Sequence, residues 1–370
     1  MNSKIHIRSI ENPIFTPRMT KAEKIKNFDQ NSIGQKKSGM FGLPFSLEEC
    51  ETVLIPVPWE VTVSYGGGTA NGPKAIFDAS YQVDLLDPIV KDAWKLGIGM
   101  DEANKTIRSK SNLLRKKAEE CIDALANGKT YEKNKKLATN AKQIHDGCLW
   151  LNKTIKERCL HFMNKNKIVG LIGGDHSTPL GMMQALAEKH DSYAILQLDA
   201  HADLRNAYEG FEFSHASVMY NAIKIKQVSK LVQVGIRDLC QEEMDLITNN
   251  PKIKTFFDRD IKHTQYRGDS WDRICNRIIN ELPDKVYLSF DIDALDPKLC
   301  PNTGTPVAGG FETEEILFLI EKVVKSGKTI IAFDINEVTP AKNNDWDANV
   351  ASRLLYRISN LVALSQKRIA

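Results

Sequence analysis

The segment Ala194–Arg205, AILQLDAHADLR, carries three ionisable side chains at the end of an apolar run. Its first residues are typical of a buried strand, and Asp199, His201 and Asp203 then occupy alternate positions. Side chains alternate between the two faces of a strand, so residues i, i+2 and i+4 point the same way. The spacing therefore predicts two carboxylates and one imidazole on one face at a strand end.

Two further apolar runs end in side chains of the same kind. Asp291 and Asp293 close the run LSFDIDALDP, and His176 follows the run LIGGDHS. The carboxyl ends of parallel strands meet at one edge of a sheet, where open α/β folds bind their ligands. We therefore expect four aspartates and two histidines from three strand ends to converge on one crevice.

Crowded carboxylates of this kind need compensating positive charge. Unpaired buried carboxylates cost several kcal/mol each and repel one another. No nearby run supplies enough Lys or Arg, whereas two divalent cations, about 3.5–4 Å apart in hydrolytic sites, accept this many ligands. Oxygen-rich ligation with some imidazole favours manganese and leaves nickel, cobalt and iron open. Two cations that share a water turn it into a hydroxide nucleophile, so the predicted reaction is hydrolysis.

These residues need a parallel sheet to bring them together. The chain of 370 residues contains six apolar runs bounded by turn residues, typical of strands buried on both faces. The predicted strands span residues 52–58, 167–174, 193–200, 231–236, 285–293 and 329–338. Amphipathic helices are predicted at 180–190, 313–326 and 349–364. The alternation predicts an α/β fold, with a central, mainly parallel sheet between helices on both faces.

The regions outside this alternation define the predicted domain organisation. Residues 104–165 are rich in Lys and Glu and are predicted to be helical, with a solvated loop at 127–136. Residues 1–48 are polar and basic, so we predict a partly ordered N-terminal arm that covers a neighbouring surface. Dispersed charge and few aromatic residues disfavour the alternative, a nucleic-acid tail. No internal repeat or linker interrupts residues 49–370, which we predict to form one catalytic domain.

Composition narrows the class of protein. The formal net charge of +3 is close to balance and gives no argument for binding nucleic acid. No stretch approaches the roughly 20 apolar residues of a membrane helix, and the first residues lack the apolar centre of a signal peptide. The seven cysteines are scattered without a C-x-x-C pair. We therefore expect reduced thiols, a cytoplasmic location, and neither nucleic-acid nor membrane partners.

Four motifs occur together and in order along the chain. They are GGDHS (173–177), DAHADLR (199–205), SFDIDALDP (289–297) and GTPVAGG (304–310). As a set they resemble the ureohydrolases, the family of arginase and agmatinase, from about residue 52 to the C-terminus. The resemblance implies a three-layer α/β/α arginase-like fold, a homo-oligomer of three or six subunits, and two divalent metal ions per subunit, usually manganese.

The resemblance also implies which residues act. One side of the metal pair is held or bridged by His176, Asp199, Asp203 and Asp291, and the other is completed by His201 and Asp293. His215, in FEFSHAS, sits where the family has a mobile histidine, whose near-neutral pKa would let it pass a proton to the leaving amine; a structural histidine is the alternative. Glu337, in DINEVTP, matches the glutamate that binds a guanidinium through paired hydrogen bonds.

Other residues near the expected pocket have less specific signals. Thr305 resembles a family residue placed near the guanidinium, although a turn role competes. Thr69 lies in a glycine-rich loop close to the pocket, and a turn role is equally open there. Asp334, three residues before Glu337, is predicted to brace the loop. The expected catalytic set is therefore Asp203, His215 and Glu337.

The loop after the ligand strand indicates the substrate. Arg205 stands where arginases carry an asparagine, so LRNAYEGFEFSHAS resembles an agmatinase branch instead. Segments 56–73 and 343–356, with the long arm, resemble the guanidine hydrolases of that group. Trp346, on a polar loop, is expected to shorten the pocket at its mouth, because free guanidine has no tail to accommodate.

The predicted function is hydrolysis of guanidine to urea and ammonia. A guanidine hydrolase would use nickel in place of manganese, and an accessory protein could deliver the metal. Agmatine or another short guanidino compound is the alternative substrate. A catalytically silent relative that serves as a regulatory subunit is the alternative of another class, and the complete set of ligands speaks against it.

Overall fold

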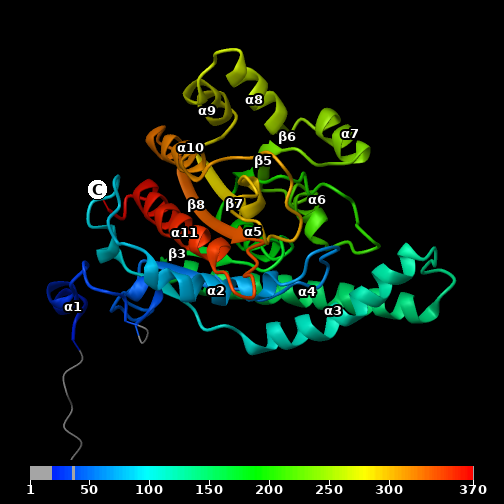
Figure 1. Cartoon of the computed structure of the whole chain (residues 1–370), viewed down its shortest axis with the longest axis horizontal. Coiled ribbons are helices and arrows are strands. Elements are labelled where there is room, and N and C mark those ends of the chain that lie inside the picture. The colour runs from blue at the N-terminus through cyan, green and yellow to red at the C-terminus, as the bar shows by residue number, and fades with distance from the viewer. Residues whose placement is uncertain (1–18, 36–37, 370) are drawn as a thin grey trace, which may run out of the picture.

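The structure, a computed structural model that describes residues 19–35 and 38–369, is centred on one sheet of eight parallel strands (Figure 1). The strands lie in the order β2-β1-β3-β8-β7-β4-β5-β6. Their bounds are β1 Thr52–Pro56, β2 Ile98–Met100, β3 Ile168–Ile172, β4 Tyr193–Leu198, β5 Val228–Ile236, β6 Ile253–Phe257, β7 Lys285–Asp291 and β8 Thr329–Asn336. The expected three-layer α/β/α fold is confirmed.

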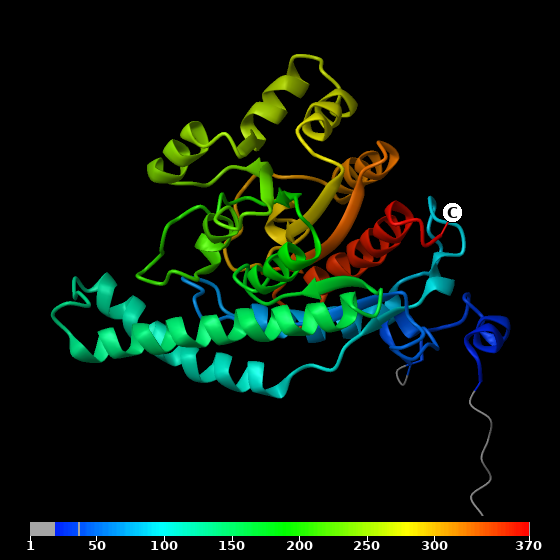
Figure 2. The same cartoon turned by 180° about the vertical axis from the view of Figure 1, so that it is seen from behind.

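Helices cover both faces of the sheet (Figure 2). Their bounds are α1 Lys21–Asn27, α2 Gly72–Ala79, α3 Lys105–Ala126, α4 Lys135–Met163, α5 Leu180–Lys189, α6 Val218–Ala222, α7 Gln241–Asn249, α8 Asp258–Tyr266, α9 Trp271–Asn280, α10 Thr313–Lys325 and α11 Trp346–Ser365. One core joins the sheet to α2, α9, α10 and α11, and the other joins it to α3, α4, α5 and α6. Within β4, Leu196 and Leu198 face the first core and Tyr193 and Ile195 face the second, as the strand alternation requires.

Each of the six predicted strands is present, and two edge strands were missed. β2 has three residues, too few for a periodic signal. β6 buries Ile253 but leaves its other residues partly or fully exposed, because an edge strand has a neighbour on one side only. The sequence did not reveal β2 and β6 because an edge strand does not require the continuous apolar run that marks a central strand.

The predicted helical region forms a long hairpin of α3 and α4 that extends beyond the sheet (Figure 1). The side chain of Asn134 caps the start of α4 by accepting hydrogen bonds from the backbone N–H of Lys136 and Leu137. Within the arm, α1 and the buried side chains of Met40 and Phe41 are features that were not predicted from the sequence. None of the described helices is long and apolar enough to cross a membrane.

Candidate metal centre

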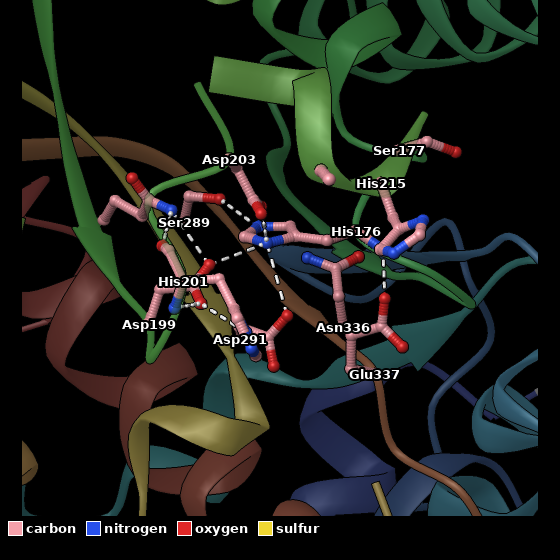
Figure 3. A network of polar contacts seen from close by, with 12 residues as sticks. His176, Ser177, Asp199, His201, Asp203, His215, Ser289, Asp291, Asn336 and Glu337 are labelled. Carbon is pink, nitrogen blue, oxygen red and sulfur yellow. Dashed lines mark hydrogen bonds and ion pairs between the residues drawn. The ribbon is translucent and has the colours of Figure 1, made fainter. Parts of the chain in front are cut away.

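The carboxyl ends of three central strands bring the predicted ligands together (Figure 3). His176 lies in the turn after β3, and Asp199 directly follows β4. Asp291 is the last residue of β7, and Asp293 lies in the short 3-10 helix that follows it. The six residues predicted from the sequence therefore meet at one place, at the edge of the sheet where parallel folds bind ligands.

One cluster of ligand atoms surrounds the ring of His176. Its Nδ1 atom lies 2.9 Å from Asp199 Oδ2, 2.9 Å from Asp203 Oδ2 and 3.3 Å from Asp291 Oδ2. Despite these short distances, Nδ1 makes no hydrogen bond. An imidazole nitrogen can bond at most one of three such oxygens, so their convergence on it is the arrangement expected of atoms that share a cation.

A second cluster lies beside the first and shares one aspartate with it. The Nδ1 atom of His201 lies 2.9 Å from Asp293 Oδ2 and 3.7 Å from Asp199 Oδ1. Asp199 thus presents one carboxylate oxygen to each histidine. Ligand atoms of His176, Asp199 and Asp291 lie within 4.8 Å of one another, as do those of Asp199, His201 and Asp293. The donor set fits two divalent cations joined by a common carboxylate.

The charges of the site also favour such cations. Asp199, Asp203, Asp291 and Asp293 are buried, and in the described part of the chain their carboxylates form no ion pair with Lys or Arg. Burial and the charge of Asp199 raise the pKa of Asp203 to about 7. Burial opposes charge on His201, yet Asp293 and Asp199 overcome it and raise the pKa of that ring to about 12. The site therefore attracts positive charge strongly.

A chain of hydrogen bonds behind His176 orients its ring. The Nε2 atom lies 3.0 Å from the hydroxyl of Ser289, which donates to Asp334 Oδ1 at 3.2 Å. Because that hydroxyl proton is used, Ser289 accepts from Nε2–H, and the lone pair of Nδ1 faces the aspartates. Tyr287 and Asn336 also donate to Asp334, which lies in β8. Asp334 therefore braces strands and ligands rather than the loop alone.

Two carboxylate residues of the site have backbones in the left-handed region. The φ angles are +54° at Asp203 and +62° at Glu337. Residues other than glycine adopt this region at a cost, and such strain concentrates at functional sites. In Glu337 it places Oε1 2.8 Å from the backbone N–H of His176, from which it accepts. Burial and the charge of Asp175 hold the pKa of Glu337 well above its usual range.

His215 lies at the start of the segment leading into α6, beside the predicted metal ligands. Its backbone N–H donates to Thr62 Oγ1 at 3.2 Å, and its ring packs edge-on against Tyr208, with centroids 6.1 Å apart. Burial and the charge of His201 lower its pKa to about 3. A near-neutral pKa was expected from the sequence. The imidazole is instead uncharged at neutral pH, and a proton must reach it before it can donate one.

A cavity of about 150 Å³ opens on the two clusters. Its wall includes His176, His201, Asp203, Asp291, Asp293, His215, Thr305 and Glu337. The remaining lining residues are Ser64, Arg205, Tyr208, Ala216, Asp238, Leu239 and Glu243. The cavity therefore combines predicted metal ligands, the predicted proton carrier and the predicted guanidinium-binding carboxylate.

Comparison with known proteins places the chain in a family. The sequence model of the Arginase family matches residues 50–359. The chain belongs to the arginase family. An N(1)-aminopropylagmatine ureohydrolase of Thermus thermophilus is 30% identical over 318 residues, covering 86% of this chain and 92% of the relative. The agmatinase of Bacillus anthracis is 25% identical and covers 84% and 91% of the two chains. These relatives place this arginase-family chain in the agmatinase-like branch.

Solved structures show the same fold. The agmatine ureohydrolase of Thermoplasma volcanium has a TM-score of 0.64 at 21% identity, covering 94% of this chain and 99% of the other. The proclavaminate amidino hydrolase of Streptomyces clavuligerus has a TM-score of 0.68 at 20% identity, covering 90% and 99%. At these identities the likeness concerns the architecture, which this arginase-family chain shares across nearly its whole described length.

Two residues predicted for the pocket do not line the cavity. Thr69 is buried, and its hydroxyl lies 3.5 Å from the carboxylate of Glu60. Trp346 is 42% exposed at the start of α11, where its indole N–H donates to the carbonyl of Lys298 at 3.0 Å. The expectation that Trp346 shortens the pocket stays a prediction, and the function proposed below does not depend on it.

Some of the residues that line the cavity were missed at the level of sequence. Asp238 lies two residues after the end of β5, so the rule that found residues at the strand ends could have found it as well. Tyr208 lies in a loop with no periodic signal. Glu243 lies on α7, where it accepts a hydrogen bond from the backbone N–H of Cys240 in a local capping box. It also accepts one from the backbone N–H of Leu204, a contact that only tertiary structure reveals.

Proposed function

We propose that this chain hydrolyses a guanidinium C–N bond at a binuclear metal centre, with guanidine as substrate and urea and ammonia as products. The observation that carries the proposal is the pair of buried ligand clusters joined by Asp199, open to a cavity that also holds Glu337 and His215. His176, Asp199, Asp203 and Asp291 would hold one ion, and His201 and Asp293, with Asp199, the other. When bound, the two cations would supply an activated water nucleophile near neutral pH.

The remaining side chains would bind substrate and move protons. A guanidinium bound beside Glu337 would favour the ionised carboxylate, which opposes the effect of burial. The carboxylate would then accept paired hydrogen bonds from two guanidinium N–H groups and fix the central carbon against the ligand clusters. As the new C–O bond forms and one C–N bond breaks, the leaving nitrogen needs a proton. His215, uncharged at neutral pH, would accept a proton from the attacking water and deliver it to the leaving nitrogen, with Asp203 beside it in the cavity.

The wall of the cavity supports guanidine as the substrate. At about 150 Å³ the cavity is smaller than the roughly 300–1,000 Å³ of sites that take drug-sized ligands. Arg205 also lines it, and its positive charge opposes the distal ammonium of agmatine. Free guanidine needs neither a longer cavity nor a partner for a distal charge.

Agmatine, or a longer aminopropyl derivative, is the second candidate. Two further carboxylates line the cavity: Glu243 lies 3.9 Å from the guanidinium of Arg205, whereas the exposed Asp238 could pair with an ammonium group. The names of the curated relatives, which include agmatinases and N(1)-aminopropylagmatine ureohydrolases, favour this alternative. The identity of the substrate therefore depends on which charge dominates the wall away from the metal ligands.

One assay separates these candidates. The purified protein is loaded separately with manganese and with nickel, and urea release is measured from guanidine, agmatine, guanidinobutyrate and arginine. We expect guanidine to be preferred and nickel to support the higher rate. Agmatine turnover far above that of guanidine would refute the guanidine proposal. The absence of urea from every substrate with either metal would leave the regulatory-subunit alternative.

The cellular location, the oligomeric state and the delivery of the metal are part of the same proposal. We propose a cytoplasmic homo-oligomer of three or six subunits, for which sedimentation of the purified protein gives the test. If nickel is the active ion, we propose that an accessory protein delivers it. Co-expression with candidate metallochaperones should then raise the nickel content per subunit, measured by elemental analysis.

A further inference from the structure

The tip of the α3–α4 hairpin contacts the loop that carries three residues of the cavity wall. The two segments lie side by side in both views of the molecule (Figures 1 and 2). Tyr131, between the two helices, donates a hydrogen bond from its hydroxyl to the backbone carbonyl of Glu209 at 2.6 Å. This contact joins positions 78 residues apart in the sequence.

Glu209 and Gly210 form the tip of a tight turn. Tyr208 and Phe211 exchange backbone hydrogen bonds of 3.2 Å and 2.8 Å across it. Positive φ angles at Glu209 (+53°) and Gly210 (+81°) are those of a two-residue hairpin turn. A Cβ atom on Gly210 would lie 2.4 Å from Cε2 of Tyr131, so the aromatic ring rests directly against the turn. Tyr131 therefore fixes the turn by packing as well as by its hydrogen bond.

The hairpin turn at Glu209 and Gly210 also determines the position of part of the cavity wall. Tyr208, next to the clamped carbonyl, lines the cavity. Its ring lies 4.7 Å from the guanidinium carbon of Arg205 and 6.1 Å from the ring of His215. Movement of the turn would therefore shift Tyr208 and the side chain of Arg205 that it contacts. Both side chains limit the space available to substrate. The same movement removes the aromatic neighbour of His215.

The hairpin holds a second loop at the same cavity. Ser111 of α3 accepts a hydrogen bond from the backbone N–H of Glu60 at 3.0 Å. Arg115, one turn further along α3, donates to the backbone carbonyls of Val61 and Val63. Between those two residues, the hydroxyl of Thr62 accepts the backbone N–H of His215. One hairpin therefore braces both loops that meet at His215.

We propose that the α3–α4 hairpin sets the size of the substrate cavity, with Tyr131 as the positioning residue that holds the turn of Glu209 and Gly210 closed. This inference rests on the proposed function, because it assumes that the cavity takes a guanidino compound. A closed turn restricts the cavity to small substrates. A loosened turn admits substrates with a longer tail, such as agmatine.

The variant Tyr131→Phe tests the inference, because it keeps the ring against Gly210 and removes only the hydroxyl. We expect faster hydrogen exchange in the segment 205–214, followed by mass spectrometry. We also expect the ratio of kcat/KM for agmatine to that for guanidine to rise about fivefold, the effect of one neutral hydrogen bond. Both substrates are assayed in one preparation, so a change in the active fraction or metal content cancels from the ratio.

Tyr266→Phe is the matched control, because Tyr266 is 80% exposed and does not line the cavity. It should change neither the exchange rate nor the ratio. An unchanged exchange rate in Tyr131→Phe would overturn the positioning role. Faster exchange with an unchanged ratio would overturn the link to cavity size. Absence of urea from every guanidino compound with the wild-type protein would refute the proposed function, while the exchange rate still decides whether Tyr131 holds the turn.

Discussion

Replacing Asp203 with asparagine should separate the stability of the fold from its capacity for metal. The substitution keeps the shape of the side chain and removes its negative charge. Asparagine also tolerates the φ of +54° found at this position better than most residues. The variant should therefore fold normally, and any change in stability should come from electrostatics.

The size of the effect follows from the raised pKa of Asp203. Burial and the charge of Asp199 raise that pKa from 3.8 to about 7. Each tenfold change in proton affinity is worth about 1.4 kcal/mol, so the ionised carboxylate destabilises the metal-free fold by at most about 4 kcal/mol above pH 7. Because the folded state binds this proton more tightly, the cost is absent below about pH 4 and grows until about pH 7. The variant avoids this cost.

The assay is unfolding of wild-type protein and Asp203→Asn in EDTA, from pH 4 to pH 8. We expect equal stability at pH 4 and a variant more stable at pH 8, by about 5 °C in Tm for a chain of this length. Adding manganese or nickel should reverse the order, because the variant has lost a charged ligand. Asp238→Asn is the control, since the Asp238 side chain is 67% exposed and its replacement should change stability by less than about 0.5 kcal/mol. A metal-free variant less stable than wild type at pH 8, or one with full metal affinity, would refute the reasoning.

Three further predictions concern other parts of the site. Ser289→Ala removes the acceptor that orients His176, so metal affinity measured by calorimetry should fall about 10–100-fold while the fold is retained; an unchanged affinity would contradict the orienting role. Glu337→Gln should lower kcat/KM by at least about 100-fold with unchanged metal content by elemental analysis, because a neutral amide cannot pair with guanidinium; loss of metal instead would make Glu337 a ligand. Cys240 is the one partly exposed cysteine and the other six are buried, so native thiol titration should label a single cysteine per chain, and Cys240→Ser should abolish the signal.

The convergence of the acidic and histidine residues at the candidate metal centre was the most predictable part of the molecule. Alternating ionisable residues at strand ends report both the strand and the face to which they point, so Asp199, His201 and Asp203 could be grouped from spacing alone. The sharing of Asp199 between His176 and His201 could not, because it depends on the packing of strands that lie far apart in the sequence. For Trp346, an aromatic residue on a polar loop, the sequence carries no information on the direction of the ring.

The hairpin of α3 and α4 illustrates a different limit. Its helices and solvated loop were predicted from composition. Its contact with the turn at Glu209 was not, because Tyr131 lies in a segment that reads as an ordinary exposed loop. Loops that interact with other loops carry no periodicity of their own. The loops of the cavity wall are therefore less predictable than the residues at the strand ends.

The order of the strands has a consequence for how the protein is made. β8 is the last strand of the chain, yet it lies in the sheet between β3 and β7. Until β8 is synthesised and inserted, the strand that positions His176 and the strand that ends in Asp291 have no common neighbour. A nascent chain therefore carries all six predicted ligands before it can bring them together. Binding of a metal pair at this site would therefore have to await the synthesis and insertion of β8.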